Sequence, residues 1–263
     1  MTTDRHAKAI EIAQQAGQLA LDYFRKVSEL KIIDKGAQDF VTEADQNVET
    51  RIRELIEAAF PDDGIVGEEH APKQGASGYT WVIDPIDGTT NFINAIPAWT
   101  VVLAIVQQDQ TVIGVIHDAN HGETFSALKG HGANLNGTPL TCPANGRIDR
   151  GTISVGYGTH ATPEITLGLL QEVMQRGGVF SRLASGALCL AYVAAGRFVG
   201  YLEEYMNAWD CLAGQLIISE AGGRVEEHSA TDMIANGGRV IAGSDALFDE
   251  LVAIADSAMQ GKR

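Results

Sequence analysis

The chain has 263 residues, of which 45% are hydrophobic and 20% are charged, enough for one large globular domain or two smaller ones with a substantial core. Its net charge of −15, from 19 basic and 34 acidic residues, disfavours nucleic acid and anionic lipid as partners. No apolar run reaches the roughly 18 residues of a membrane span, so we expect no membrane contact. The N-terminal stretch is polar, unlike a secretory signal, and the three cysteines lack metal-type spacing, so we expect a cytoplasmic protein.

Helices and strands alternate along the first half of the chain. Apolar residues recur with a helical period over residues 4–26, and a second helix is predicted from the capping-box pair Thr42 and Asp45 to Pro61. Shorter β-rich stretches follow at residues 63–70 and 81–84, then a hairpin over 100–119 and a strand with a Gly/Asn-rich turn over 123–140.

Proline, glycine, asparagine and charge gather at residues 141–151, and we place a boundary there, between residues 1–145 and 146–263. Beyond it, helices are predicted over 163–176, 185–196, 209–223 (with a glycine C-cap) and from residue 245 onward. Strands are predicted over 151–158, 197–204, 223–228 and 237–244. The alternation predicts stacked α and β layers.

Several acidic residues stand at the ends of these elements. Asp84 ends a predicted buried strand and Asp87 lies in the turn after it, yet no Lys or Arg occurs between Asp84 and Trp99. Glu68 follows another strand and Asp210 opens a helix, and such positions converge on one crevice in α/β folds. Carboxylates that meet there need cations, and ligands that are all oxygen favour Mg²⁺ first and Mn²⁺ next.

Each of these residues also has a structural reading. Asp before Pro-X-Asp-Gly is ordinary turn chemistry, Asp210 suits a helix N-cap, and Asp45 suits a capping box. The stretch from Glu68 to His70 reads as a solvated loop. A turn alone, however, needs only one or two of the residues in the string "DPIDGTTNF" (residues 84–92).

That string, followed much later by "WDCLAGQLIISEAGG", resembles the inositol monophosphatase family, part of the lithium-sensitive, Mg²⁺-dependent phosphatase superfamily. "VTEADQNVE", "GEE" and "AYVAAGRFVGYLE" also occur in the family's order, so the resemblance covers essentially the whole chain. It implies an α/β chain with layered α+β character, an α/β/α/β/α sandwich of the inositol monophosphatase and fructose-1,6-bisphosphatase type. It further implies a homodimer, with most metal ligands in the first half and Asp210 and the substrate pocket in the second.

The resemblance also implies a site with two to three Mg²⁺ ions. Glu68, Asp84 and the carbonyl of Ile86 would hold the first ion, and Glu68 would also contact a weaker third. Asp84, Asp87 and Asp210 would hold the second. Two such ions clamp the attacking and leaving oxygens of an in-line displacement.

Further roles come from the same resemblance. Thr89 and Asp45 would orient the attacking water, and the N–H groups of Gly88 and Thr89 would cradle the phosphate. The alcohol part of the substrate would lie against Ser185, Gly186, Ala187 and Glu203. Glu204 competes for the last role, because strand alternation sends only one of the pair inward.

The expected activity is therefore Mg²⁺-dependent hydrolysis of a small phosphorylated alcohol, with inositol 1-phosphate as the family's type substrate. Histidinol phosphate, fructose 1,6-bisphosphate and a 3′-phosphonucleotide are alternatives within the same chemistry. A catalytically idle family member that acts as a binding protein is the alternative of another class, although such a role would not demand the complete acidic set.

Overall fold

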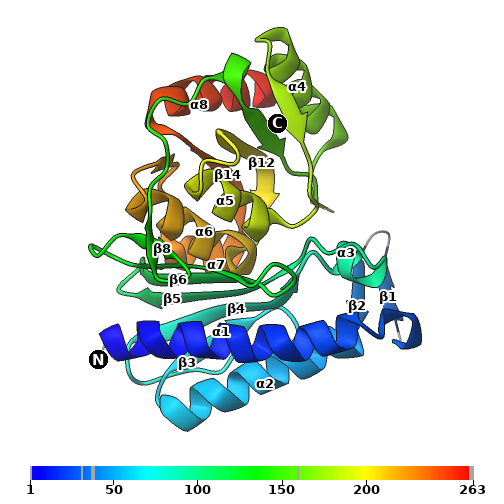
Figure 1. Cartoon of the computed structure of the whole chain (residues 1–263), viewed down its shortest axis with the longest axis vertical. Helices are drawn as coiled ribbons and strands as arrows, with labels where there is room; N and C mark the ends of the chain where they lie inside the picture. Colours follow the sequence, from blue (N-terminus) through cyan, green and yellow to red (C-terminus); the bar gives the residue numbers. More distant parts are fainter. Residues whose placement is uncertain (1, 31, 37–38, 159, 261–263) are drawn as a thin grey trace.

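The computed structural model describes residues 2–30, 32–36, 39–158 and 160–260. Its elements form five layers, with two sheets separated by one pair of helices and covered on their outer faces by two other pairs (Figure 1). The predicted α/β/α/β/α sandwich is confirmed.

The first two layers are a pair of helices and a seven-stranded sheet. The sheet has the order β3-β4-β5-β6-β7-β8-β9, and its neighbours are antiparallel except for the parallel pair β3 and β4. Helices α1 (Thr2–Phe24) and α2 (Glu43–Ala59) pack their apolar faces on one side of it. The strands are β3 (Gly64–Gly67), β4 (Tyr79–Asp87), β5 (Thr100–Gln107), β6 (Gln110–Asp118), β7 (Glu123–Leu128), β8 (Ala133–Leu135) and β9 (Thr138–Leu140).

The middle layer consists of α5 (Gly186–Ala194) and α6 (Ala208–Glu220), two helices that are almost entirely buried between the sheets. Their small residues permit close packing. A Cβ on Gly114 of β6 would lie 2.6 Å from the carbonyl oxygen of Ala213 in α6, and one on Gly214 would lie 2.5 Å from Leu190 in α5. Glycine at these two places therefore lets α6 approach both the sheet and its partner helix.

The last two layers are a five-stranded sheet and an outer helix pair. The sheet has the order β11-β10-β12-β14-β13. Helices α4 (Pro163–Gln175) and α8 (Asp245–Met259) cover its outer face. The strands are β10 (Thr152–Val155), β11 (Val179–Ser181), β12 (Gly200–Met206), β13 (Arg224–Val225) and β14 (Gly238–Gly243).

The chain crosses between the two sheets over residues 141–151, where the sequence predicts a boundary. This crossing contains one short 3-10 helix, η2 (Ile148–Arg150). The division into residues 1–145 and 146–263 stays a prediction. Because one core cluster combines side chains of β5 and β6 with those of α5, α6 and β12, the two sheets share a core through the middle helices.

Most predicted elements are present, with local differences. The strand predicted over 223–228 is limited to β13, although the Glu226 N–H still donates to the Ile241 carbonyl oxygen of β14 at 2.9 Å. The sequence does not predict the hairpin of β1 (Ile32–Gly36) and β2 (Asp39–Thr42), the short helices η1 (Val27–Glu29) and α7 (Ala230–Asn236), or the edge strand β11. The turn after Asp87 includes a short helix, α3 (Thr89–Ile93).

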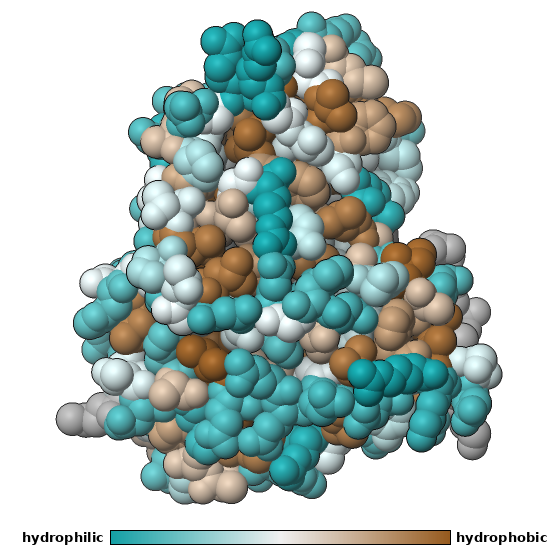
Figure 2. All heavy atoms as spheres, viewed as in Figure 1, coloured by the Kyte–Doolittle hydropathy of each residue, from teal (hydrophilic) through white to brown (hydrophobic). Residues whose placement is uncertain are grey.

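On the face seen in Figure 2, hydrophilic and apolar residues are mixed, and apolar residues lie over the middle of the molecule as well as toward the end that carries α4. Four of the large exposed hydrophobic residues belong to α4 and the edge strand β11, namely Leu167, Met174, Val179 and Phe180. None of the helices among the described residues is both long and apolar enough to cross a membrane.

Candidate active site

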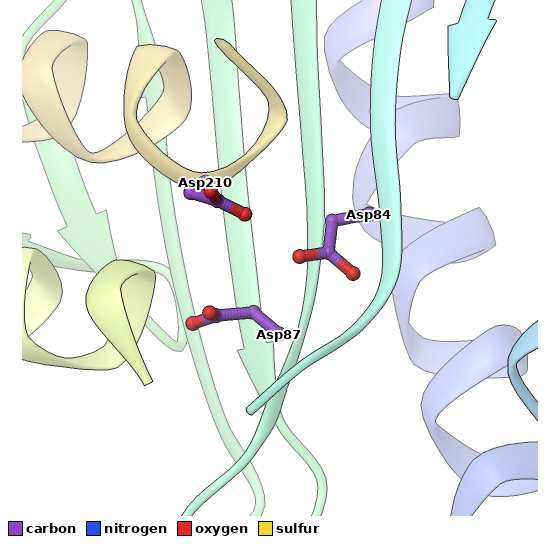
Figure 3. Close-up of side chains that lie close together, drawn as sticks. All are labelled: Asp84, Asp87 and Asp210. Atoms are coloured by element: carbon purple, nitrogen blue, oxygen red, sulfur yellow. The ribbon is translucent and has the colours of Figure 1, made fainter. Parts of the chain in front are cut away.

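Three aspartates from separate elements meet at one end of the middle layer. Asp84 and Asp87 lie at the end of strand β4, and Asp210 lies in the first turn of helix α6 (Figure 3). One carboxylate oxygen from each of the three residues lies within 4.8 Å of the corresponding oxygen of the other two. The structure thus brings together the acidic residues of the two longest sequence motifs.

Burial raises the pKa of all three carboxyl groups, and repulsion from neighbouring carboxylates adds to the effect at Asp84 and Asp210. The pKa of Asp84 is raised well above its ordinary value by burial, and then by the charges of Glu68, Asp87 and Asp210. Burial and the Asp87 charge raise the pKa of Asp210 to about 7. A site that penalises its own negative charge in this way favours a bound cation.

Asp87 is fixed by the start of helix α5. Its carboxylate accepts hydrogen bonds from Ser185 Oγ at 2.5 Å, the Gly186 N–H at 3.2 Å and the Ala187 N–H at 2.9 Å. These donors oppose the effect of burial, which still raises the pKa of Asp87. These three residues therefore position Asp87, and their predicted place against the alcohol part of the substrate stays a prediction.

Asp84 and Asp210 are held by their own backbone surroundings. The Ile86 N–H donates to Asp84 Oδ1 at 2.9 Å and closes a local turn. Asp84 Oδ2 takes no part in this hydrogen bond. Asp210 closes a capping box with Asn207, whose backbone N–H and side-chain Nδ2 donate to Asp210 Oδ2 at 3.3 Å and 3.4 Å. The N-cap role read from the sequence for Asp210 belongs to Asn207.

A hydroxyl–carboxylate pair lies beside the aspartates. Thr89 Oγ1 donates to Asp45 Oδ1 at 3.2 Å and also approaches the Ile86 carbonyl oxygen at 3.2 Å. Asp45 Oδ2 accepts from the Thr42 N–H at 2.8 Å and from Thr42 Oγ1 at 2.6 Å. Each oxygen of Asp45 has a different task, so the capping-box role and a role toward Thr89 coexist.

Gly88 makes the turn between the aspartates and Thr89. Its φ of +99° is in the left-handed region, and a Cβ there would lie 3.0 Å from the Ala98 carbonyl oxygen and 3.2 Å from that of Ala184. Both the conformation and the space therefore require glycine. The same turn brings the Thr89 hydroxyl back over the Ile86 carbonyl.

Glu68 lies near the cluster but outside the group of three. It follows β3, whose Gly67 pairs in parallel with Ile83 of β4, so the chain places it next to Asp84. Its side chain is exposed, and its charge contributes to the raised pKa of Asp84.

Glu49, which no sequence pattern predicts as a site residue, organises the turn that contains Glu68. This residue of α2 is fully buried and accepts from the Glu69 N–H at 2.7 Å and from Arg53 Nε at 2.7 Å. A Cβ on Gly67 would lie 2.3 Å from Glu49 Oε1. A helical Glu four residues before an Arg reads as a surface ion pair, so no local signal marked this burial.

A cavity of about 170 Å³ opens next to Asp87 and Asp210. Its walls include Ser185, Gly186, Glu203 and Arg182, while Ala187 is fully buried behind them. The described lining is Asp87, Ser154, Val155, Gly156, Tyr157, Gly158, His160, Arg182, Leu183, Ala184, Ser185, Gly186, Cys189, Tyr201, Glu203, Tyr205, Met206, Asn207 and Asp210.

Glu203 is the member of the Glu203–Glu204 pair that faces this cavity. Tyr201 OH donates a very short hydrogen bond to Glu203 Oε2, and burial raises the pKa of Glu203 to about 8. Glu204 points elsewhere and accepts from the Thr162 N–H at 2.6 Å and Thr162 Oγ1 at 2.9 Å, at the start of α4.

The residues at the cluster fit a hard divalent cation. The donors are carboxylate oxygens, which Mg²⁺ prefers, and the three lie within 4.8 Å of one another. Burial, followed by repulsion from neighbouring carboxylates, raises the pKa of Asp84 and Asp210, and among the described residues no lysine or arginine forms an ion pair with any of the three aspartates.

Comparison with known proteins gives a family match over almost the whole chain. The model of the family described as "Inositol monophosphatase family" matches residues 3–260. A Haemophilus influenzae protein named "Nus factor SuhB" is 33% identical over 248 residues, which are 93% of this chain and 92% of the relative. An Aquifex aeolicus protein named "Fructose-1,6-bisphosphatase/inositol-1-monophosphatase" is 32% identical over 263 residues, 96% of this chain and 97% of the relative.

A solved structure is similar in fold as well as in sequence. The Thermotoga maritima IMPase superposes with a TM-score of 0.86 at 30% identity, covering 98% of this chain and 98% of that one.

Proposed function

Because the chain belongs to the inositol monophosphatase family, we propose that it hydrolyses a small phosphate monoester in a Mg²⁺-dependent reaction, with inositol 1-phosphate as the preferred substrate. The observation that carries the proposal is the group of Asp84, Asp87 and Asp210 at the mouth of a cavity that also contains Glu203. The aspartates would act on the phosphate, and the cavity would receive the alcohol.

We assign the metal ligands as the family resemblance predicts. Asp84, Glu68 and the Ile86 carbonyl would hold one Mg²⁺, and Asp84, Asp87 and Asp210 a second, with a weaker third at Glu68 and with Mn²⁺ as a substitute. When bound, the ions would offset the charge of the phosphate and lower the pKa of the attacking water.

The residues of this chain supply the proton acceptor and the orientation. Thr89 donates its hydroxyl hydrogen to Asp45 Oδ1, which leaves the Thr89 oxygen able to accept a hydrogen bond from a water. Burial raises the pKa of Asp45, which makes it a better proton acceptor than an exposed aspartate. The pair is therefore suited to take the proton that leaves the water.

The alcohol side favours a neutral, hydroxyl-rich group. Tyr201 occupies Glu203 Oε2, and a Cβ on Gly158 would lie 3.7 Å from the other carboxylate oxygen, Oε1, which has no hydrogen bond among the described residues. A free acceptor beside the small residues Ser185 and Gly186 suits a ring of hydroxyl donors. Histidinol phosphate, fructose 1,6-bisphosphate and a 3′-phosphonucleotide stay as alternatives for the same machinery.

The second candidate is a binding role without turnover, raised by relatives named as Nus factors. In that case Asp84, Asp87 and Asp210 would stabilise the fold or bind a metal ion without taking part in hydrolysis. The completeness of the set, with Thr89 aligned on Asp45 and Asp87 held by three donors, favours catalysis.

A phosphate-release assay tests the proposal. The purified chain is incubated with inositol 1-phosphate, histidinol phosphate, fructose 1,6-bisphosphate and a 3′-phosphonucleotide, each with Mg²⁺, with Ca²⁺ or with EDTA. We expect release with Mg²⁺ only, the highest kcat/KM on inositol 1-phosphate, and inhibition by Li⁺ as in the family. Calcium bonds of about 2.3–2.6 Å, against 2.0–2.1 Å for Mg²⁺, would misplace the reacting groups. Full turnover in EDTA would remove the metal from the proposal, and absence of turnover on every substrate would favour the binding role.

A further inference from the structure

A second, smaller cavity lies where the chain crosses from one sheet to the other. It has a volume of about 160 Å³, and its described walls combine the crossing, 141–151, with the segment after α5 and the residue before α8. The walls include apolar groups of Cys142, Phe198 and Val199, and the polar groups of Arg147, Arg150 and Ser244.

Ser244 contributes a hydroxyl that the protein does not use. The residue is 2% exposed, and its Oγ has no hydrogen-bond partner. A serine at the N-cap of a helix ordinarily accepts from the second or third N–H of that helix. Here the Ala246 N–H donates to the Ala144 carbonyl oxygen at 3.0 Å and the Leu247 N–H to the Ser244 carbonyl oxygen at 3.1 Å, so no N–H of the first turn reaches the hydroxyl.

Arg150 forms no ion pair among the described residues, and its charge acts only at longer range on Asp149, whose pKa is lowered mainly by the hydrogen bonds from Arg147 and further by the charges of Arg147 and Arg150. Among the described residues, every arginine forms an ion pair with a carboxylate except Arg150 and Arg182. Arg182 lines the active-site cavity and Arg150 lines the second one, so both unpaired guanidinium groups stand at cavity walls.

The remaining charges nearby are engaged elsewhere. Arg147 forms two bonds of 2.9 Å with Asp149, which neutralises both groups. Asp245, in the first turn of α8, lies 3.8 Å from Arg224. The charge left over at the cavity is therefore the positive charge of Arg150, and the positive end of the 15-residue helix α8 adds to it.

We propose that this cavity, defined by Arg150 and the buried hydroxyl of Ser244, is a second ligand site that binds a small oxyanion of the phosphate type. Arginine offers several N–H donors to such an anion, and a serine hydroxyl adds a further donor at the buried end. The site is separate from the aspartate group, and it does not depend on the proposed hydrolysis.

Equilibrium dialysis with radiolabelled inorganic phosphate tests the site in the full-length, metal-free protein with EDTA present. Without metal the three active-site aspartates repel phosphate, so binding there does not contribute. We expect saturable binding by the wild type, with a Kd raised about tenfold or more by Arg150→Ala and about threefold or more by Ser244→Ala. The Ser244 hydroxyl has no hydrogen-bond partner and the Arg150 guanidinium has no ion pair among the described residues. Neither substitution breaks such a contact, so both variants should keep the wild-type circular dichroism.

The matched control is Arg182→Ala, which removes the other unpaired arginine and leaves the second cavity intact. We expect its Kd for phosphate to stay within about twofold of the wild type. The proposal is overturned if the wild type binds no phosphate saturably, if Arg150→Ala binds as tightly as the wild type, or if Arg182→Ala weakens binding as much as Arg150→Ala. Since no turnover is measured, none of these outcomes bears on the proposed phosphatase activity.

Discussion

The two ends of the active-site cavity both bury carboxyl groups, but they balance them differently. At one end Asp84, Asp87 and Asp210 face one another, and no lysine or arginine of the described residues pairs with them. At the other end Glu203 stands alone, receives the Tyr201 hydroxyl and feels the positive charge of Arg182. The aspartate end therefore favours a cation from outside, whereas the single carboxyl group of Glu203, whose pKa burial raises to about 8, can take up a proton instead.

This difference separates the two tasks of the proposed enzyme. Charge that the fold leaves unbalanced attracts the ions that act on a phosphate. A single buried carboxyl group can be neutralised by a proton, and it stays available for hydrogen bonds to the alcohol. Substitutions at the aspartate end should therefore affect every substrate alike, and those at the Glu203 end should distinguish substrates.

The largest effect is expected at the aspartate end. Asp84→Asn or Asp210→Asn should lower phosphate release on all substrates to the background, by about 10³-fold or more, because each removes one charged ligand. Isothermal titration with Mg²⁺ should show weakened binding in the same variants, while circular dichroism should show a retained fold. Lost activity with unaltered Mg²⁺ affinity would refute the ligand assignment.

The next effect is expected at the hydroxyl beside the aspartates. Thr89→Ala should lower kcat by about 10²–10⁴-fold and change KM little, because the hydroxyl orients a water in the transition state and contributes little to substrate binding. Steady-state kinetics on inositol 1-phosphate measures both parameters. The control is Thr90→Ala, which removes a neighbouring hydroxyl that is not bonded to Asp45. If Thr89→Ala kept more than about half the activity, the proton acceptor would have to be another group.

The unbalanced charge should also appear in the stability of the metal-free protein. Burial and Asp87 raise the pKa of Asp210 from 3.8 to about 7. A raised carboxyl pKa means that folding is favoured while the group is protonated, so this contribution is complete below pH 3.8 and is lost as the pH rises through about 7. We expect the Tm in EDTA to fall between pH 5 and pH 8, and Mg²⁺ to restore it at pH 8.

The same scans on Asp210→Asn isolate this contribution from those of other groups. Asparagine does not titrate, so the decline in Tm across this range should be smaller in the variant than in the wild type. Parallel pH profiles for the two proteins would show that Asp210 is not the source.

The aspartate end could be predicted from the sequence because its chemistry is concentrated in contiguous residues. Asp84, Asp87, Gly88 and Thr89 belong to one turn, and the rule that strand ends and helix starts converge was enough to add Asp210. The Glu203 end was harder, because Ser185, Gly186 and Ala187 open a helix. Whether such N–H groups face a ligand or a carboxylate depends on packing, and here α5 directs them to Asp87.

The fold shows the same division. The long helices α1, α2 and α8 have a clear apolar period and a recognisable start or stop, so they were predicted within a few residues. Helix α7 and strand β11 are too short to show a period, and β13 is an edge strand of two residues. The buried Glu49 depends on Gly67, which is distant in sequence, so no local pattern indicates it.

The smallest effect, and the most selective, is expected from Glu203→Gln. At a pH above about 8, where Glu203 is ionised, the amide keeps one acceptor oxygen but loses the negative charge, so kcat/KM for the neutral polyol of inositol 1-phosphate should change by no more than about threefold. Histidinol phosphate carries a protonated amine, and its kcat/KM should fall about tenfold, because a hydrogen bond from an ammonium to a carboxylate is stronger than one to an amide.

Kinetics of wild type and Glu203→Gln on the two substrates decide between the readings, with Glu204→Gln as the matched control, since Glu204 binds Thr162 and does not face the cavity. If the wild type preferred histidinol phosphate about tenfold, and Glu203→Gln alone removed that preference, the proposed substrate would be wrong. The phosphate chemistry would be unaffected by that result. Asp84, Asp87 and Asp210 lie at the other end of the cavity, where the alcohol contributes no charge to their balance.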